Sequence, residues 1–157
     1  MDCKASIIGE ETVKKYLTPE DVIEICEKTW KWYGEGKVIM PNKITTDMSA
    51  LGVAGWYNSM PAYIGPMDVA GIKVVGGYDG NKALGLPYIK ANVLVTDSRT
   101  GILRALVSGD YINDMRTGAQ PAIMARMLAA STDVVTFIGT GLMAYYSLLC
   151  MSKLVQM

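Results

Sequence analysis

Residues 88–107, YIKANVLVTDSRTGILRALV, contain the clearest signal for the fold. Two runs with apolar and β-branched residues, 88–96 and 102–107, flank the segment Asp97-Ser98-Arg99-Thr100-Gly101. A period of two predicts β-strands, and a short Gly-containing segment between two such runs predicts a hairpin loop. We therefore predict an antiparallel strand pair here.

The same period extends towards the N-terminus as far as residue 38. Short β-type runs lie at 38–40, 43–46, 53–57 and 72–75, separated by turn signals and not by helices. This arrangement predicts an antiparallel or mixed sheet, and therefore an α+β fold once helices pack on it.

Two helices are predicted around this sheet. The first begins at Thr18-Pro19-Glu20-Asp21, which resembles a capping box followed by a first-turn proline. It ends at Gly34 and Gly36, and its apolar stripe comprises Val22, Cys26, Thr29 and Tyr33, with Ile25 and Trp30 beside them. The second spans 110–130, but Gly118 and Pro121 predict that its regular part starts near Thr117 or Gln120. Its predicted buried stripe comprises Ile123, Met124, Met127 and Leu128.

The segment that follows has the pattern of a dinucleotide-binding turn. Residues 134–138, VVTFI, are continuously apolar and β-branched, which predicts a buried parallel strand. Gly139-Thr140-Gly141-Leu142-Met143-Ala144 then fits G-x-G-x-x-A, with a helix expected over 145–155. The helix amides, including those of Leu142 and Met143, would face a pyrophosphate. The alternative is a plain glycine turn after a core strand.

The rest of such a nucleotide-binding unit is not found in the sequence. The acidic residue that binds the ribose lies ~20 residues after the turn, whereas Met157 follows Ala144 by thirteen residues. We predict a sheet domain at 1–132 and the truncated start of a Rossmann domain at 133–157. The chain is then either a piece of a longer protein or a reduced form.

Composition excludes several classes of function. The 157 residues carry 15 basic and 15 acidic side chains, so no overall positive field favours nucleic acid or an anionic membrane. The absence of histidine excludes Ser–His and Cys–His nucleophiles, and three widely spaced cysteines argue against a zinc site. We expect no metal, no membrane span and no signal peptide, and hence a cytoplasmic protein. The low charged fraction of 19% favours oligomerisation.

Three cations stand out in this neutral chain. Strand alternation puts Lys73 on one face of the 72–75 strand with Val75, opposite Ile72 and Val74. Lys73 either lies on an exposed sheet face or serves as an anion-holding or proton-transferring amine. Arg116, at the predicted helix start, opposes the helix dipole, which makes sense if an anion binds there. Lys43, Lys73 and Arg116 can converge on a carboxylate.

Several segments together resemble the ornithine cyclodeaminase/mu-crystallin family. The resemblance extends from about residue 17 to 149, and the segments that carry it are Met60–Tyr63, Gly71–Val75, Gly80-Asn81, Gly85-Leu86-Pro87, Leu94–Asp97 with Thr100-Gly101, Arg116–Ala119 and Ile138–Leu142. It implies an N-terminal sheet domain that forms a homodimer, a Rossmann domain for NAD or NADP, and an active site between them. The implied chemistry is hydride transfer at the α-carbon of an amino or imino acid, as in an ornithine cyclodeaminase, amino-acid dehydrogenase or ketimine reductase.

The resemblance also implies roles for individual residues. Lys73 matches the catalytic lysine that holds the substrate carboxylate and assists proton transfer, and Arg116 matches a second carboxylate-binding residue near the nicotinamide. Lys43 and Met60 match substrate-pocket positions. The positions implied to contact the cofactor are Arg116, Thr117, Gly139, Thr140, Gly141, Leu142 and Met143.

The sequence departs from the family pattern at three points. Lys43 stands in place of an arginine, and lysine lacks the planar fork that binds a carboxylate through two hydrogen bonds. Tyr88 replaces a small hydroxyl residue, and the family's catalytic aspartate would lie beyond Met157. The alternative function is therefore a non-catalytic, crystallin-like dimeric module that binds a small carboxylate.

Overall fold

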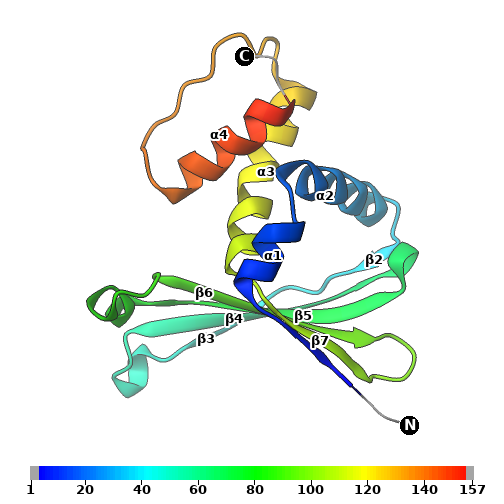
Figure 1. Cartoon of the computed structure of the whole chain (residues 1–157), viewed down its shortest axis with the longest axis vertical. Coiled ribbons are helices and arrows are strands. Elements are labelled where there is room, and N and C mark those ends of the chain that lie inside the picture. Colours follow the sequence, from blue (N-terminus) through cyan, green and yellow to red (C-terminus); the bar gives the residue numbers. More distant parts are fainter. Residues whose placement is uncertain (1–3, 155–157) are drawn as a thin grey trace.

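The computed structural model describes residues 4–154, which form a mixed sheet with helices on one of its faces (Figure 1). The strands are β1 (Ser6–Ile8), β2 (Val38–Ile39), β3 (Ile44–Asp47), β4 (Gly55–Ile64), β5 (Val69–Tyr78), β6 (Ile89–Asp97) and β7 (Leu103–Ser108). The helices are α1 (Glu10–Tyr16), α2 (Pro19–Gly34), α3 (Asp110–Leu128) and α4 (Leu142–Leu154), and short 3₁₀ turns lie at 49–51, 65–67 and 79–84. The α+β class predicted from the sequence is confirmed.

The sheet is seven-stranded, in the order β1-β7-β6-β5-β4-β2, with β3 also pairing with β4. The predicted hairpin joins β6 to β7, and the Asp97 carboxylate accepts hydrogen bonds from the Thr100 amide at 2.9 Å and hydroxyl at 2.7 Å. Strand β4 is longer than predicted because it continues through Pro61. On one edge, β4 pairs with β3 as far as Ser59 and with β2 from Tyr63 onwards. Pro61 lies in the unpaired gap between them, where its missing N–H costs no ladder hydrogen bond.

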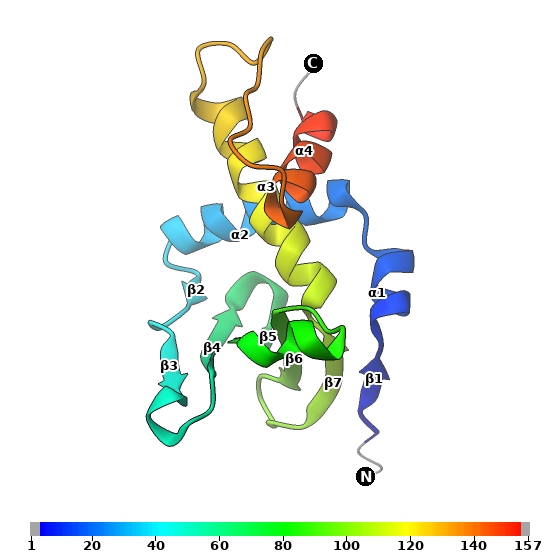
Figure 2. The same cartoon turned by 90° about the vertical axis from the view of Figure 1, so that its left-hand side faces the viewer.

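Two short elements were not predicted, namely β1 and α1. Strand β1 is three residues long and pairs parallel to β7 at the sheet edge, and α1 has seven residues. Neither is long enough to establish a hydrophobic period. Figure 2 shows both beside the edge of the sheet. No helix within residues 4–154 is long and apolar enough to cross a membrane.

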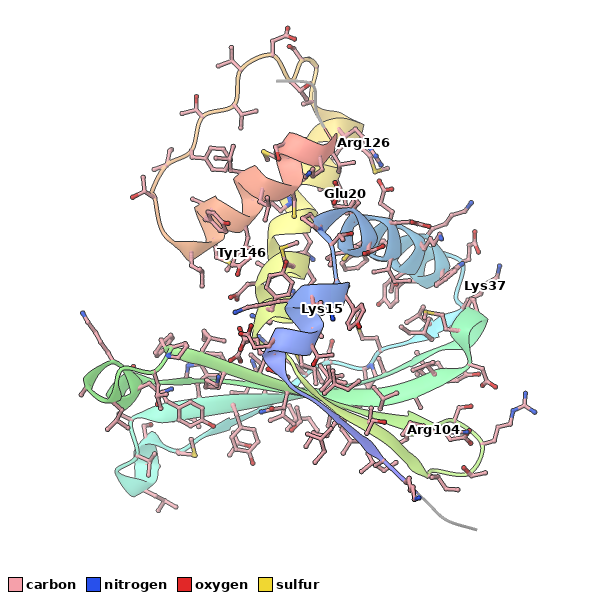
Figure 3. The ribbon with its side chains drawn as sticks, in the orientation of Figure 1. Lys15, Glu20, Lys37, Arg104, Arg126 and Tyr146 are labelled. Carbon is pink, nitrogen blue, oxygen red and sulfur yellow. The ribbon has the colours of Figure 1, made fainter. Side chains whose placement is uncertain are left out.

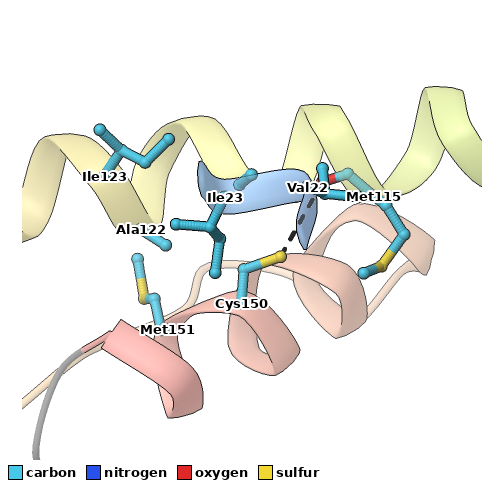
Figure 4. Close-up of a cluster of buried hydrophobic side chains, with 8 residues drawn as sticks. Val22, Ile23, Met115, Ala122, Ile123, Cys150 and Met151 are labelled. Carbon is cyan, nitrogen blue, oxygen red and sulfur yellow. Dashed lines mark hydrogen bonds between the residues drawn. The ribbon is translucent and has the colours of Figure 1, made fainter. Parts of the chain in front are cut away.

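The main core lies between α2, α3 and α4 (Figure 4). Helix α2 begins with the predicted capping box, in which the Asp21 amide donates to Thr18 Oγ1 at 3.2 Å and the Thr18 amide donates to Asp21 Oδ2 at 3.0 Å. Arg126 and Glu20, both labelled in Figure 3, form ion pairs between these helices: Arg126 of α3 pairs with Glu27 of α2, and Glu20 of α2 pairs with Lys153 of α4 at 3.1 Å. The buried members of the core are Val22, Ile23, Met115, Ala119, Ala122, Ile123, Cys150 and Met151.

Helix α3 differs from its prediction in start and in buried face. It begins at Asp110 and runs through Gly118 and Pro121. Gly118 does not weaken the helix start; it allows close packing, because a Cβ there would lie 2.5 Å from the Tyr146 carbonyl carbon of α4. The small residues Gly118, Ala119 and Ala122 turn their side of α3 towards the core. The predicted stripe is wrong except at Ile123, since its other members are exposed: Met124 by 53%, Met127 by 67% and Leu128 by 77%.

The predicted strand at 134–138 does not form. Val135 and Phe137 pack against the helical core, but Val134 is 85% exposed and Ile138 is fully exposed. A buried parallel strand needs a hydrogen-bonded neighbour on at least one side, and the strands of the described chain all lie within 6–108 and pair with one another. Helix α4 begins at Leu142, three residues before its predicted start at Tyr145. The division into domains at 1–132 and 133–157 stays a prediction.

Candidate functional site

Lys73 lies in the middle of β5 on the face that the helices cover. Its neighbour Val75 is only 7% exposed, whereas Val74, which points to the other face, is 38% exposed. The half-buried Lys73 side chain reaches α3, where its Nζ donates a hydrogen bond to Asn113 Oδ1 at 3.0 Å. The alternative of an exposed sheet face is therefore excluded for Lys73.

Arg116 meets the same oxygen atom. Its Nη2 donates to Asn113 Oδ1 at 3.1 Å. Asn113 is 9% exposed and was not predicted from the sequence. A polar residue one helical turn before Arg116 was the available signal, but its partner Lys73 is forty positions away in the chain. Arg116 is in the second turn of α3, so the prediction that it opposes the dipole at the helix start is wrong.

These cations form no ion pair within residues 4–154. No carboxylate of residues 4–154 lies within ion-pair distance of Lys43, Lys73 or Arg116, and the buried Nε of Arg116 has no hydrogen-bond acceptor there. Burial, Arg116 and Lys43 together lower the pKa of Lys73 to about 8. Burial also lowers the pKa of Arg116. Such a cluster can bind an anion, and an amine with this pKa can exchange a proton near neutral pH.

The two remaining predicted substrate residues lie on neighbouring strands. Met60 of β4 is directly opposite Lys73 in the β4–β5 register and is partly buried. Lys43 immediately precedes β3, is exposed, and lies close enough to Lys73 to lower its pKa. The structure thus brings all four predicted substrate residues, Lys43, Met60, Lys73 and Arg116, to one region.

A cleft of about 990 Å³ opens beside this region, between the sheet layer and the start of α4. Asn113 and Thr117 form part of its wall, and the Thr117 hydroxyl donates to the Asn113 carbonyl oxygen at 2.6 Å. Tyr88 also lines it. Lys73 and Arg116 are not in the lining, so they lie behind Asn113 as viewed from this cleft.

The opposite wall of the cleft is the glycine-rich turn. Gly139, Gly141, Leu142 and Met143 line it, whereas the exposed Thr140 does not. Gly139 has a φ of +100°, which favours glycine, and a Cβ at Gly139 or Gly141 would meet nothing within 4 Å. The first amides of α4 have no acceptor within the helix. This open backbone at a helix N-terminus fits the pyrophosphate of a dinucleotide, although residues 134–138, directly before the turn, are irregular and not a strand.

Comparisons with known proteins identify the family of this chain. The family model for the ornithine cyclodeaminase/mu-crystallin family matches residues 4–157. An alanine dehydrogenase of Archaeoglobus fulgidus is 32% identical over 143 residues, covering 90% of this chain and 42% of that protein. The mouse ketimine reductase mu-crystallin is 32% identical over 112 residues, covering 71% of this chain and 35% of its own length.

Solved structures give the same result. An archaeal alanine dehydrogenase dimer with bound NAD superposes with a TM-score of 0.89 at 30% identity, over 96% of this chain and 46% of that one. The Thermococcus litoralis Δ1-pyrroline-2-carboxylate reductase, solved with NADH and L-proline, superposes with a TM-score of 0.88 at 27% identity, over 95% and 46%. This chain spans less than half the length of these relatives. It belongs to the ornithine cyclodeaminase/mu-crystallin family.

Proposed function

We propose that this chain forms the carboxylate-binding half of an NAD(P)-dependent enzyme that acts at the α-carbon of an amino or imino acid. The observation that carries the proposal is the pair Lys73 and Arg116, two half-buried cations that share a neutral amide oxygen and have no carboxylate partner within residues 4–154. A substrate carboxylate would supply the missing charge and accept from the unused N–H groups. Relatives named for amino- and imino-acid chemistry support this choice of ligand.

Within this proposal each residue has a defined task. Arg116 binds the carboxylate, and Lys73 both binds it and exchanges a proton with the reacting nitrogen or carbon, as its lowered pKa permits. Lys43, exposed just before β3, adds positive charge to the carboxylate site, and Met60 forms an apolar wall of that site. Lysine at 43 binds the carboxylate through single, adjustable hydrogen bonds.

The cofactor is proposed to bind at the glycine-rich turn. Gly139, Gly141, Leu142 and Met143 would hold its pyrophosphate through backbone amides, and Thr117 would contact it from α3. Thr140 and Arg116, which the family resemblance also assigns to the cofactor, do not line this cleft. When bound, NAD or NADP supplies the hydride acceptor or donor. The bound NAD and NADH in two structural relatives support this assignment.

A carboxylate titration tests the substrate site without a cofactor. L-Alanine, L-proline and L-ornithine are titrated into the 157-residue chain by calorimetry or NMR, with Lys73→Met and the exposed-site control Lys82→Met. We expect Lys73→Met to weaken binding by about tenfold or more, since a charge-assisted hydrogen bond contributes ~1.5–3 kcal/mol, and Lys82→Met to have no effect. Equal binding by the chain and Lys73→Met would refute the site.

A cofactor titration separates the enzyme from the non-catalytic binding module. NADH or NADPH is added while nicotinamide and tryptophan fluorescence are followed, using Trp30, Trp32 and Trp56 as reporters. Saturable binding that Gly141→Val abolishes supports the enzyme. Carboxylate binding without any cofactor binding favours a crystallin-like module.

The uncovered sheet face is proposed to form a homodimer. The register aligns an apolar row across five strands on that face: Ile7, Leu106, Leu94, Ile72 and Pro61. Ile7 is 84% and Leu106 41% exposed, an apolar surface that an isologous interface would bury. The dimeric alanine dehydrogenase relative supports this. We also propose a cytoplasmic location, since Cys26 and Cys150 are free thiols, as is typical of a reducing compartment.

A further inference from the structure

Asn113 is the buried neutral group at which both site cations meet. We propose that Asn113 is a positioning residue whose uncharged oxygen holds Lys73 and Arg116 side by side without cancelling their charge, so that both remain available to an anion. This inference rests on the proposed carboxylate site and assigns the residue that organises it.

The Asn113 side chain is held in a single orientation by its contacts. Its Oδ1 accepts from Lys73 Nζ at 3.0 Å and Arg116 Nη2 at 3.1 Å, and cationic donors require an oxygen at that position. Its backbone is fixed as well, because the amide donates to the Gly109 carbonyl at 2.8 Å and the carbonyl accepts from Thr117 Oγ1 at 2.6 Å. Asn113 is 9% exposed, so water does not compete freely for its oxygen.

The charge balance around the pair favours a neutral acceptor. The charged groups that act on Lys73 are Arg116 and Lys43, both positive. The titratable groups that act on Arg116 are Cys26 of α2, a thiol whose own pKa burial raises, and Asp114 of α3. Asp114 Oδ1 also accepts a hydrogen bond from Asn113 Nδ2 at 3.4 Å. An aspartate at 113 would pair with both cations and compete with a ligand carboxylate. An apolar side chain would leave both without an acceptor and increase their mutual repulsion.

Two variants with opposite expected effects test this role. The pKa of Lys73 is measured in the 157-residue chain by competitive acylation and mass spectrometry over a pH series. We expect Asn113→Asp to raise the pKa of Lys73 above about 8, and thereby to slow its acylation at neutral pH by about tenfold or more. We expect Asn113→Leu to lower the pKa below that of the unmodified chain. A merely structural role would not move the pKa in opposite directions.

A matched control adds the same charge elsewhere. Asn92 is an exposed residue of β6 paired with Val74, so its side chain lies on the opposite face of the sheet from Lys73. Asn92→Asp should leave the pKa of Lys73 unchanged. An unchanged pKa in either folded Asn113 variant, or shifts of the same sign in both, would overturn the inference. If circular dichroism shows Asn113→Asp unfolded, Asn113→Leu decides alone, and a pKa at or above that of the unmodified chain overturns it.

The measurement separates this inference from the proposed function because it needs neither substrate nor cofactor. If the carboxylate titration fails but the two pKa shifts occur, Asn113 still organises the cations and only the ligand is misassigned. If carboxylates bind but the shifts do not occur, the role of Asn113 alone is refuted.

Discussion

At the residue scale, the protonation of Lys73 is coupled to folding. Its pKa is about 8 in the folded chain and 10.5 in the reference state, so the folded protein carries the cost of a partly buried charge below pH 8. As pH rises from 8 to 10.5, the folded state releases its proton before the unfolded state does. The unfolded state then binds more protons, and the stability increases with pH in this range.

We therefore predict that Lys73→Met is more stable than the unmodified chain at pH 7, by about 1 kcal/mol once solvent screening of this half-buried group is allowed for. The difference should shrink as pH rises from 8 to 10.5. Urea unfolding at a series of pH values measures it, with Lys82→Met as the control. A difference that stays constant across this range would contradict the expected coupling.

At the element scale, the packing of α3 on α4 depends on one missing side chain. A Cβ on Gly118 would lie 2.5 Å from the carbonyl carbon of Tyr146 and 2.6 Å from its oxygen, both backbone atoms that no rotamer change can move. The pair is also joined by an edge-to-face contact between Tyr111 and Tyr146 at 6.0 Å. Close approach of the two helices therefore requires glycine at this position.

We predict that Gly118→Ala lowers the free energy of unfolding by about 1–3 kcal/mol, the usual cost of overpacking. Gly34→Ala is the matched control, because a Cβ at the end of α2 would meet nothing within 4 Å and alanine has the higher helix propensity. Chemical unfolding followed by circular dichroism compares the two. Equal stabilities for the two variants would show that α3 and α4 do not pack this closely.

At the scale of the whole molecule, helices cover one face of the sheet and leave the other face uncovered. Figure 1 shows the helices on one face, whereas an apolar row with Ile72 and Leu94 occupies the other. A lysine placed in a buried apolar interface would bring an unpaired charge into it, which is strongly unfavourable.

We predict that the chain elutes at twice its 17.0 kDa mass and that Ile72→Lys converts it to monomer. Leu84→Lys is the control, since Leu84 is 73% exposed in a 3₁₀ turn outside the sheet. Sedimentation or light scattering at several concentrations gives the masses. A monomer at every concentration before substitution would refute the sheet-face dimer.

Structural features that depend on a few neighbouring residues were predicted correctly. The Thr18–Asp21 capping box, the Asp97–Gly101 hairpin and the period of β5 and β6 each depend on neighbours in the sequence. The opposite faces of Val74 and Val75 follow from strand geometry alone. Lys73 and Arg116 were found because cations are conspicuous in a neutral chain and because the family resemblance assigns their roles.

Other features depended on partners that are distant in the sequence. The run at 134–138 has the composition of a strand, yet it stays irregular because no strand of the described chain pairs with it. By its residue type Gly118 predicts a weakened helix, but in the structure it allows the backbone of Tyr146 in α4 to pack against α3. The sequence by itself determined the cap of α2, the β6–β7 hairpin and the cations of the site. Only the tertiary structure decided which helix faces are buried and that Asn113 joins Lys73 to Arg116. The physical reason is that these contacts form between residues far apart in the chain, whose meeting no local sequence pattern specifies.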